Sequence, residues 1–204
     1  MLTTVNFKPY QYKPLDRDRR EIRLIQFTAD DGVASSDDNP IRCTTTIASL
    51  DNLPKYFALL YVWGDNKKDH AILLDDQVLN ITRNLTTVLQ NLSFRGEYIW
   101  IDTICINQDD DVEKSWQVQA MKQIFQDAFK VLVWLGAEDE DIHNALGALD
   151  KIADDETLFD AEKLKNEGIL CFKPDQLLDC IANFPPTGWL LRALKKIFEH
   201  ALFH

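Results

Sequence analysis

Three short apolar runs, each followed by a glycine or by polar side chains, constrain the fold of this chain more than any other feature. They are FALLYVW at 57–63, YIWID at 98–102 and KVLVWLG at 130–136. A strand that is apolar on both faces is typical of the centre of a sheet that is covered from both sides. We therefore expect these runs to form the central strands of one buried sheet.

Helical patterns alternate with these runs. A one-sided helix is predicted after Thr82, whose hydroxyl suits an N-cap, and apolar side chains recur there at helical spacing. A second helix is predicted after the acidic residues at 109–113, and a third at 138–152. Such alternation favours crossover connections. The predicted fold class is α/β, a flavodoxin-like three-layer arrangement with a mostly parallel sheet between helices.

The remaining segments carry weaker signals. Alternating or β-branched patterns predict strands at 21–27 and 41–49, and 70–81 is typical of a hairpin with Asp75 and Asp76 at its tip. Amphipathic helices are predicted at 174–183 and 187–203. A length of 204 residues favours a single domain, 1–204, with a core at 20–154 and a helical C-terminal part at 155–204.

Charge and composition exclude several classes of function. A net charge of -11 and a pI near 4.7 argue against a nucleic-acid partner, because phosphate binding needs clustered Lys and Arg. No apolar run approaches the roughly 20 residues of a membrane span, and the N-terminal segment lacks the apolar core of a signal peptide. We therefore expect a soluble, cytoplasmic protein without a membrane span.

Motif spacing argues against a resident metal or cofactor. The cysteines, Cys43, Cys105, Cys171 and Cys180, contain no CxxC pair and are expected to be reduced and mostly buried. The glycines are never closer than eleven residues, which excludes GxGxxG and Walker loops. His200 and His204 have no evident third ligand. We predict no metal site and no cofactor.

The ends of the three apolar runs form the candidate site, because loops after parallel strands meet at one edge of a sheet. The side chains predicted there are Tyr61, Trp63, Gly64, Asp65, Asp102, Asn107, Gln108 and Trp134. The aromatic residues either stack on a flat ligand or pack over the core. Asp102 either takes part in chemistry or accepts backbone N–H groups of its own loop. Asn107 and Gln108 are suited to tying that loop down.

Glu113 and Gln117 lie one turn apart on the predicted second helix, so both side chains can face one direction. Taken alone, they are expected to be solvated or capping residues. Both alternatives remain compatible with the sequence.

Four segments of the chain carry a resemblance to a known family. They are YKPLDRDRREIRLIQF, YFALLYVWGD, LNITRNLTTVLQNL and YIWIDTICINQDDDVEKSWQVQAMKQIFQDAFKVLVWLG, in this order over 12–136. Together they resemble the successive blocks of the fungal heterokaryon incompatibility (HET) domain. The resemblance implies a role in fungal non-self recognition, with the domain triggering programmed cell death. The family is also distantly similar to Toll/interleukin-1 receptor (TIR) domains, some of which cleave NAD with a glutamate.

Two departures from the family pattern bear on activity. The first block of the family usually reads S-Y-x-W-G, and here Leu60 stands in place of the serine. The last block, R-x-W-x-x-Q-E, is expected beyond His204, so the glutamate that would align with the TIR catalytic residue is not in this sequence. Glu113 is the carboxylate that we nominate as its substitute.

These observations leave three hypotheses. The first is a signalling module that acts by self-association or by contact with a protein partner and needs no catalytic residue. The second is a TIR-type NAD glycohydrolase, in which Asp102 and Glu113 are catalytic and the other residues of the candidate site hold the nucleotide. The third is a truncated family member without activity. The first is favoured, so we expect a non-enzyme.

Overall fold

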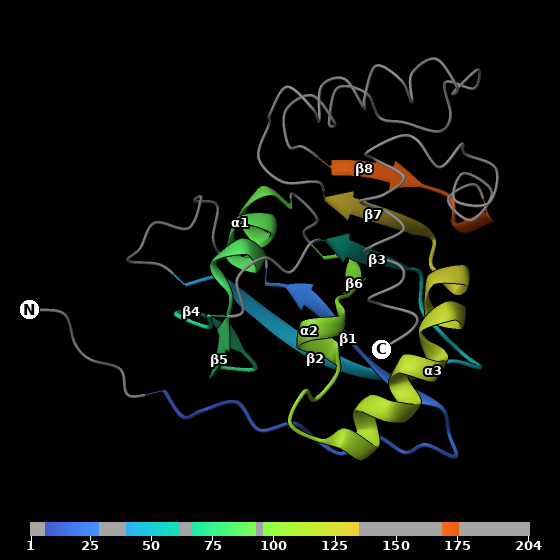
Figure 1. Cartoon of the computed structure of the whole chain (residues 1–204), viewed down its shortest axis with the longest axis horizontal. Coiled ribbons are helices and arrows are strands. Elements are labelled where there is room, and N and C mark those ends of the chain that lie inside the picture. The colour runs from blue at the N-terminus through green and yellow to red at the C-terminus, as the bar shows by residue number, and fades with distance from the viewer. Residues whose placement is uncertain (1–6, 29–39, 62–66, 93–95, 135–168, 176–204) are drawn as a thin grey trace, which may run out of the picture. The chain divides into compact units, whose positions relative to one another are not determined.

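The computed structural model describes residues 7–28, 40–61, 67–92, 96–134 and 169–175 (Figure 1). The chain divides into two compact units, each made of two segments. Unit 1 comprises Met1–Pro54 and Trp63–Ile99, and unit 2 comprises Lys55–Val62 and Trp100–His204. The helices predicted at 138–152 and 187–203, and most of the one at 174–183, lie outside the described residues.

Unit 1 is built on strands paired in the order β5-β4-β2-β1-β6. Their bounds are β1 Glu21–Phe27, β2 Arg42–Ser49, β4 His70–Leu74, β5 Gln77–Ile81 and β6 Tyr98–Trp100. β1 and β2 pair antiparallel along their length, from Glu21 opposite Ser49 to Phe27 opposite Cys43. β2 and β4 pair parallel, and β6 pairs antiparallel with β1 where Ile99 lies opposite Ile25. The strands predicted at 21–27 and 41–49 are confirmed.

The predicted hairpin is confirmed as β4 and β5, which pair antiparallel from His70 opposite Ile81 to Leu74 opposite Gln77. Asp75 and Asp76 form the tip with φ values of 49° and 58°. Two successive residues with positive φ are what a two-residue hairpin turn needs to match the twist of the strands. The Asp75 carboxylate also accepts hydrogen bonds from the backbone N–H of Thr45, at 2.8 Å, and from its hydroxyl, which ties the tip to β2.

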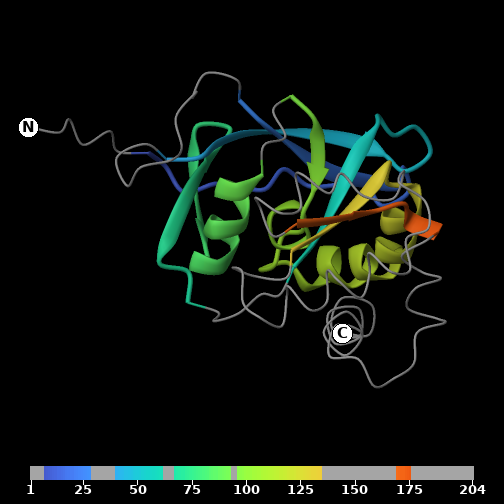
Figure 2. The same ribbon diagram turned by 90° about the horizontal axis from the view of Figure 1, so that it is seen from above.

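Helix α1, Arg83–Asn91, begins where the sequence predicted. The hydroxyl of Thr82 accepts a hydrogen bond from the backbone N–H of Leu85 at 3.3 Å, as an N-cap does. Leu85, Val88 and Leu89 are its buried residues. This apolar face packs on the hairpin, and Figures 1 and 2 both show α1 beside β4 and β5.

The extended segment before β1 covers the outer edge of β5. The backbone N–H of Tyr10 donates to the Val78 carbonyl at 2.8 Å, and the Val78 N–H donates to the Lys8 carbonyl at 2.8 Å. The buried Arg23 guanidinium lies 4.8 Å from the centre of the Tyr12 ring. An edge strand that would otherwise offer unpaired backbone groups is therefore covered by the same chain.

Unit 2 is built on strands in the order β3-β7-β8, with bounds Tyr56–Tyr61, Lys130–Trp134 and Ile169–Phe172. β3 and β7 pair parallel, from Phe57 opposite Lys130 to Tyr61 opposite Trp134. All six residues of β3 are buried, as the apolar run predicted. Two helices precede β7, the single turn α2 at Asp102–Cys105 and the long helix α3 at Asp111–Asp127.

Helix α3 runs beside β3 and β7 (Figures 1 and 2). The buried Tyr56 hydroxyl donates a hydrogen bond to the Ile124 carbonyl, and the rings of Trp100 and Phe125 meet edge to face with centres 5.4 Å apart. Burial and, next, the negative charge of Asp127 raise the pKa of Tyr56 above its ordinary value. Buried contacts between ring and backbone therefore fix α3 on the strands.

The prediction of a mostly parallel sheet is wrong, although the α/β class holds. In the described residues β1–β2, β1–β6, β4–β5 and β7–β8 pair antiparallel, whereas β2–β4 and β3–β7 pair parallel. The alternation of strands and helices indicated crossover connections, but it did not determine which strands become neighbours. β6 pairs with β1, a strand outside that alternation, and this partner reverses the relative direction.

The C-terminal part from 155 onward was predicted to be helical, and β8 corrects this prediction. Ile169–Phe172 pairs antiparallel with β7, from Trp134 opposite Ile169 to Val131 opposite Phe172. A four-residue apolar run cannot be assigned to strand or helix from periodicity alone, which explains the error. In the described part of the chain, no helix has the length and apolar character needed to cross a bilayer.

Candidate functional site

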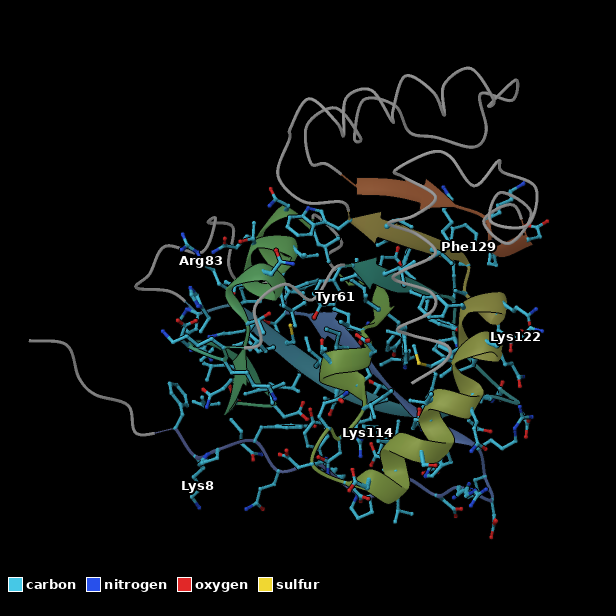
Figure 3. The ribbon with its side chains drawn as sticks, in the orientation of Figure 1. Lys8, Tyr61, Arg83, Lys114, Lys122 and Phe129 are labelled. Carbon is cyan, nitrogen blue, oxygen red and sulfur yellow. The ribbon has the colours of Figure 1, made fainter. Side chains whose placement is uncertain are left out.

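The candidate site lies in unit 2, where β3 and β7 end side by side. Parallel pairing places Tyr61 opposite Trp134, as predicted for the ends of these two runs. The Tyr61 hydroxyl is 2.9 Å from the hydroxyl of Thr103, so the loop after Trp100 reaches the same place (Figure 3). The expected convergence of the three chain segments is therefore observed.

Tyr61 is a neutral phenol within the core. Its side chain is 3% exposed. Burial is the largest cause that raises its pKa, the negative charge of Asp102 adds to the rise, and the hydrogen bond with Thr103 opposes it. A tyrosine held in its protonated form can exchange a hydrogen bond with a neighbouring hydroxyl, but it is not suited to act as a base at neutral pH.

Asp102 begins α2 instead of ending a strand, which corrects the prediction of a strand over 98–102. Its carboxylate accepts a hydrogen bond from the Thr103 backbone N–H at 2.7 Å. Its carbonyl accepts from the Ile106 N–H at 3.0 Å and from Gln108 Nε2 at 3.1 Å. Asp102 thus makes contacts within its own loop, as expected for a structural carboxylate, and Gln108 ties the loop down as predicted.

Cys105 closes the same turn from within the core. The backbone N–H of Ile101 points to its sulfur at 3.3 Å, and both residues are buried. Cys43 and Cys105 are buried and Cys171 is partly exposed, and these three are thiols outside any disulfide, which agrees with the prediction of reduced cysteines at these positions. Cys105 therefore acts as a small core residue with a weak acceptor.

Glu113 connects the loop to α3. One carboxylate oxygen accepts a hydrogen bond from the Asn107 backbone N–H at 2.7 Å, and the side chain amide oxygen of Asn107 accepts from the Asp109 N–H at 3.2 Å. Asp110 is the N-cap of α3, so Glu113 occupies the third helical position. A glutamate there usually returns to the N–H of the N-cap residue, and in this chain it reaches three residues further back.

Burial of Glu113 and Gln117 corrects part of the prediction made for them. Glu113 is 6% exposed and Gln117 is 0% exposed, so neither is solvated. Glu113 does act as a capping residue in the wider sense, since it satisfies a backbone N–H just before the helix. The spacing of one helical turn correctly predicted that Glu113 and Gln117 share one face of the helix. It could not predict that this face is buried.

Thr103 is the residue that the sequence reasoning missed. It stands next to Asp102, and the signal that points to it is a hydroxyl within the polar run that follows Trp100. Trp134 is 4% exposed, which matches packing over the core better than stacking on a ligand. Trp63, Gly64 and Asp65 lie outside the described residues.

No three His, Cys, Asp or Glu side chains gather closely enough to hold a metal ion within the part of the chain that the structure describes.

Comparison with known families agrees with the resemblance seen in the sequence. The model of the family described as heterokaryon incompatibility protein (HET) matches residues 56–196. The chain belongs to the HET family. Among curated proteins it is similar to heterokaryon incompatibility protein 6, OR allele, of Neurospora crassa, with 34% identical residues over 72% of this chain. The chain spans 23% of the length of that relative. No solved structure matches the chain.

The HET match begins at Tyr56, the first residue of β3, and the first of the four quoted segments, 12–27, lies before it. Leu60, which replaces the serine of the family pattern, is 3% exposed and lies opposite Val133 of β7. At this position the side chain contributes to the apolar core of unit 2 and offers no hydroxyl to a ligand.

Proposed function

We propose that this HET chain acts in fungal non-self recognition as a module that triggers cell death through self-association or contact with a protein partner. The observation that supports this proposal is that the polar side chains of the candidate site make hydrogen bonds within the chain itself. Tyr61 bonds with Thr103, Gln108 bonds with the Asp102 carbonyl and Glu113 bonds with the Asn107 N–H. These polar side chains hold the loop between β6 and α3.

Burial of the same residues favours a binding module over a hydrolase. A catalytic carboxylate must reach the reacting atoms, whereas Glu113 is 6% exposed and accepts a backbone N–H. Stacking on a nucleotide needs an open ring face, whereas Tyr61 and Trp134 are 3% and 4% exposed. The family role in heterokaryon incompatibility then has to be carried by the surface of the module.

A biophysical and a cellular experiment test this proposal together. The purified chain should show an average mass that rises with concentration in sedimentation velocity, or should form a complex with a partner from incompatible cells. Expression of the chain in compatible hyphae should increase the fraction of cells that take up a vital dye. A chain that remains monomeric, finds no partner and leaves hyphae alive would contradict the proposal.

NAD cleavage is the second candidate, and one observation favours it. The half-buried Asp102 carboxylate, Tyr61 and Thr103 gather at the end of the parallel pair β3 and β7, the edge at which α/β sheets bind ligands. Release of free nicotinamide from NAD would support it. An Asp102→Asn variant should then lose that release, and a Glu113→Gln variant with unchanged turnover would remove Glu113 from the mechanism.

A further inference from the structure

Two large apolar side chains are exposed at opposite ends of α3. Val112, in the first turn, is 74% exposed. Phe129, two residues after Asp127, where the helix ends, is 46% exposed. A helix of 17 residues is about 25 Å long, so the two residues stand far apart in one unit. Figure 3 shows Lys114 near the beginning of this helix and Phe129 beyond its other end. Singly exposed apolar side chains are common on protein surfaces, so the charges around each one decide whether it suits contact with another protein.

Phe129 lies among positive charges. The ammonium group of Lys55 is 3.8 Å from the centre of its ring, and that of Lys130 is 5.8 Å away. The ring meets Phe57 edge to face at 5.7 Å, and the Phe129 N–H donates to the Tyr56 carbonyl at 2.8 Å. The Phe129 surface, defined as Phe129 with Lys55 and Lys130, is thus an apolar centre on a fixed backbone with a positive rim.

Lys122 and Asp127 lie in the second half of α3, and Lys173 and Asp175 follow β8, whose Phe172 lies opposite Val131. With Lys55 and Lys130 the described charges toward this end are four lysines to two aspartates, so the rim stays positive. Two lysines beside one ring are too few to release counterions along a nucleic acid, and the chain as a whole carries a charge of -11.

Val112 lies among negative charges. The Val112 surface is defined as Val112 with the exposed residues Asp109, Asp110 and Asp111. The Asp110 carboxylate caps the helix, and the Asp111 side chain is 95% exposed with one oxygen 3.5 Å from the Lys114 ammonium. The balance is three carboxylates to one ammonium group, so this apolar centre has a negative rim.

We propose that the Phe129 surface of one copy of the chain docks onto the Val112 surface of a second copy. Each surface has an apolar centre, and their rims carry opposite charge, which favours this pairing and disfavours contact between two identical surfaces. Because the surfaces lie at opposite ends of one helix, a pair leaves free the Val112 surface of one copy and the Phe129 surface of the other. Head-to-tail contacts of this kind extend into a chain of copies unless the rotation closes a ring.

This inference rests on the proposed function and names the surfaces through which self-association takes place. A contact centred on one phenylalanine and one valine is small, so a single contact is weak and assembly depends on concentration. A module that assembles only when its local concentration rises is suited to a signal that must stay off in undisturbed cells.

The test uses the full chain and two variants, Phe129→Ala and Val112→Ser, in sedimentation velocity over a range of concentrations. Each variant alone should remain monomeric, with an association constant at least tenfold below that of the wild-type chain. Their equimolar mixture should form dimers and grow no further, because each variant keeps the surface that the other has lost. Ile47→Ser, at an exposed apolar residue of unit 1, is the matched control and should associate like wild type.

The outcomes separate this inference from the proposal on which it rests. A wild-type chain that associates while both variants associate equally well would overturn the named surfaces and leave self-association standing. A wild-type chain that is monomeric throughout would overturn both. A mixture of the variants that stays monomeric would overturn the head-to-tail arrangement.

If circular dichroism shows that Phe129→Ala does not fold, a pair of charge-reversal variants replaces it in the test. Lys55→Glu alone should weaken association at least tenfold, and mixing it with Asp111→Lys should restore association, because each variant keeps the rim that the other has reversed and the two reversed rims also attract each other. Association of the Lys55→Glu chain at the wild-type level, or a mixture no stronger than Lys55→Glu alone, would overturn the inference.

Discussion

Replacement of Glu113 measures how much the loop before α3 depends on one carboxylate. In Glu113→Ala the Asn107 N–H loses its acceptor at 2.7 Å, which costs about 1 kcal/mol because the residue is half-buried and water can reach part of it. One methylene group of a side chain that is 6% exposed, Cγ, is lost as well, at about 0.8 kcal/mol. The free energy of unfolding should therefore fall by about 2 kcal/mol.

Glu113→Gln separates charge from shape. The amide oxygen can still accept from the Asn107 N–H, but the hydrogen bond is no longer charge-assisted, so the expected loss is about 1 kcal/mol. For a chain of this size, roughly 2–4 °C of melting temperature corresponds to each kcal/mol. The Ala variant should thus melt about 4–8 °C below wild type, and the Gln variant about 2–4 °C below.

Urea unfolding followed by circular dichroism measures both losses from the shift in midpoint at constant slope. Gln119→Ala, on an exposed position of the same helix, is the matched control and should stay within about 0.5 kcal/mol of wild type. The reasoning would be refuted by a Glu113→Ala chain that is as stable as this control. A catalytic role would instead show as unchanged stability with lost nicotinamide release.

Three further perturbations follow from buried or capping contacts. Burial raises the pKa of both Tyr56 and Tyr61, so the folded chain keeps protons that the unfolded chain releases above pH about 10. Stability should fall by up to about 1.4 kcal/mol per pH unit for each tyrosine above that pH, and urea midpoints that stay level from pH 9 to 11 would contradict this. Thr82→Ala should cost about 1 kcal/mol in urea unfolding through loss of the α1 cap, whereas Thr87→Ala within the helix should cost less. Asp75→Ala should cost about 2 kcal/mol, since it removes two hydrogen bonds to Thr45 and leaves alanine at positive φ, and a thermal melt like that of wild type would disprove it.

Local features of the fold were predictable because their causes lie within a few residues. The hairpin at 70–81 needs only a two-residue tip, and α1 needs only a capping hydroxyl with apolar spacing behind it. Strand neighbours were less predictable, because pairing depends on residues far apart in the chain. The pairing of β6 with β1, more than seventy residues earlier, has no local signature in either strand.

The candidate site was predictable in position and less so in role. The parallel pair β3 and β7 brings Tyr61 beside Trp134, as the two apolar runs indicated. The hydroxyl pair of Tyr61 and Thr103 depends on how the loop folds back, and nothing in the order of residues shows that path. The same holds for Glu113, whose acceptor role toward Asn107 appears only when the loop and α3 are placed together.

The polar residues after Trp100 are best explained by their role in stabilising a tight loop. The Gln108 amide donates to the Asp102 carbonyl, the Asn107 N–H donates to the Glu113 carboxylate, and the Ile101 N–H donates to the Cys105 sulfur. Each polar group satisfies a backbone group that a sharp turn beside a buried strand leaves without a partner. In this HET chain the polar run therefore determines the path of the loop between Trp100 and α3, and its side chains are used within that loop.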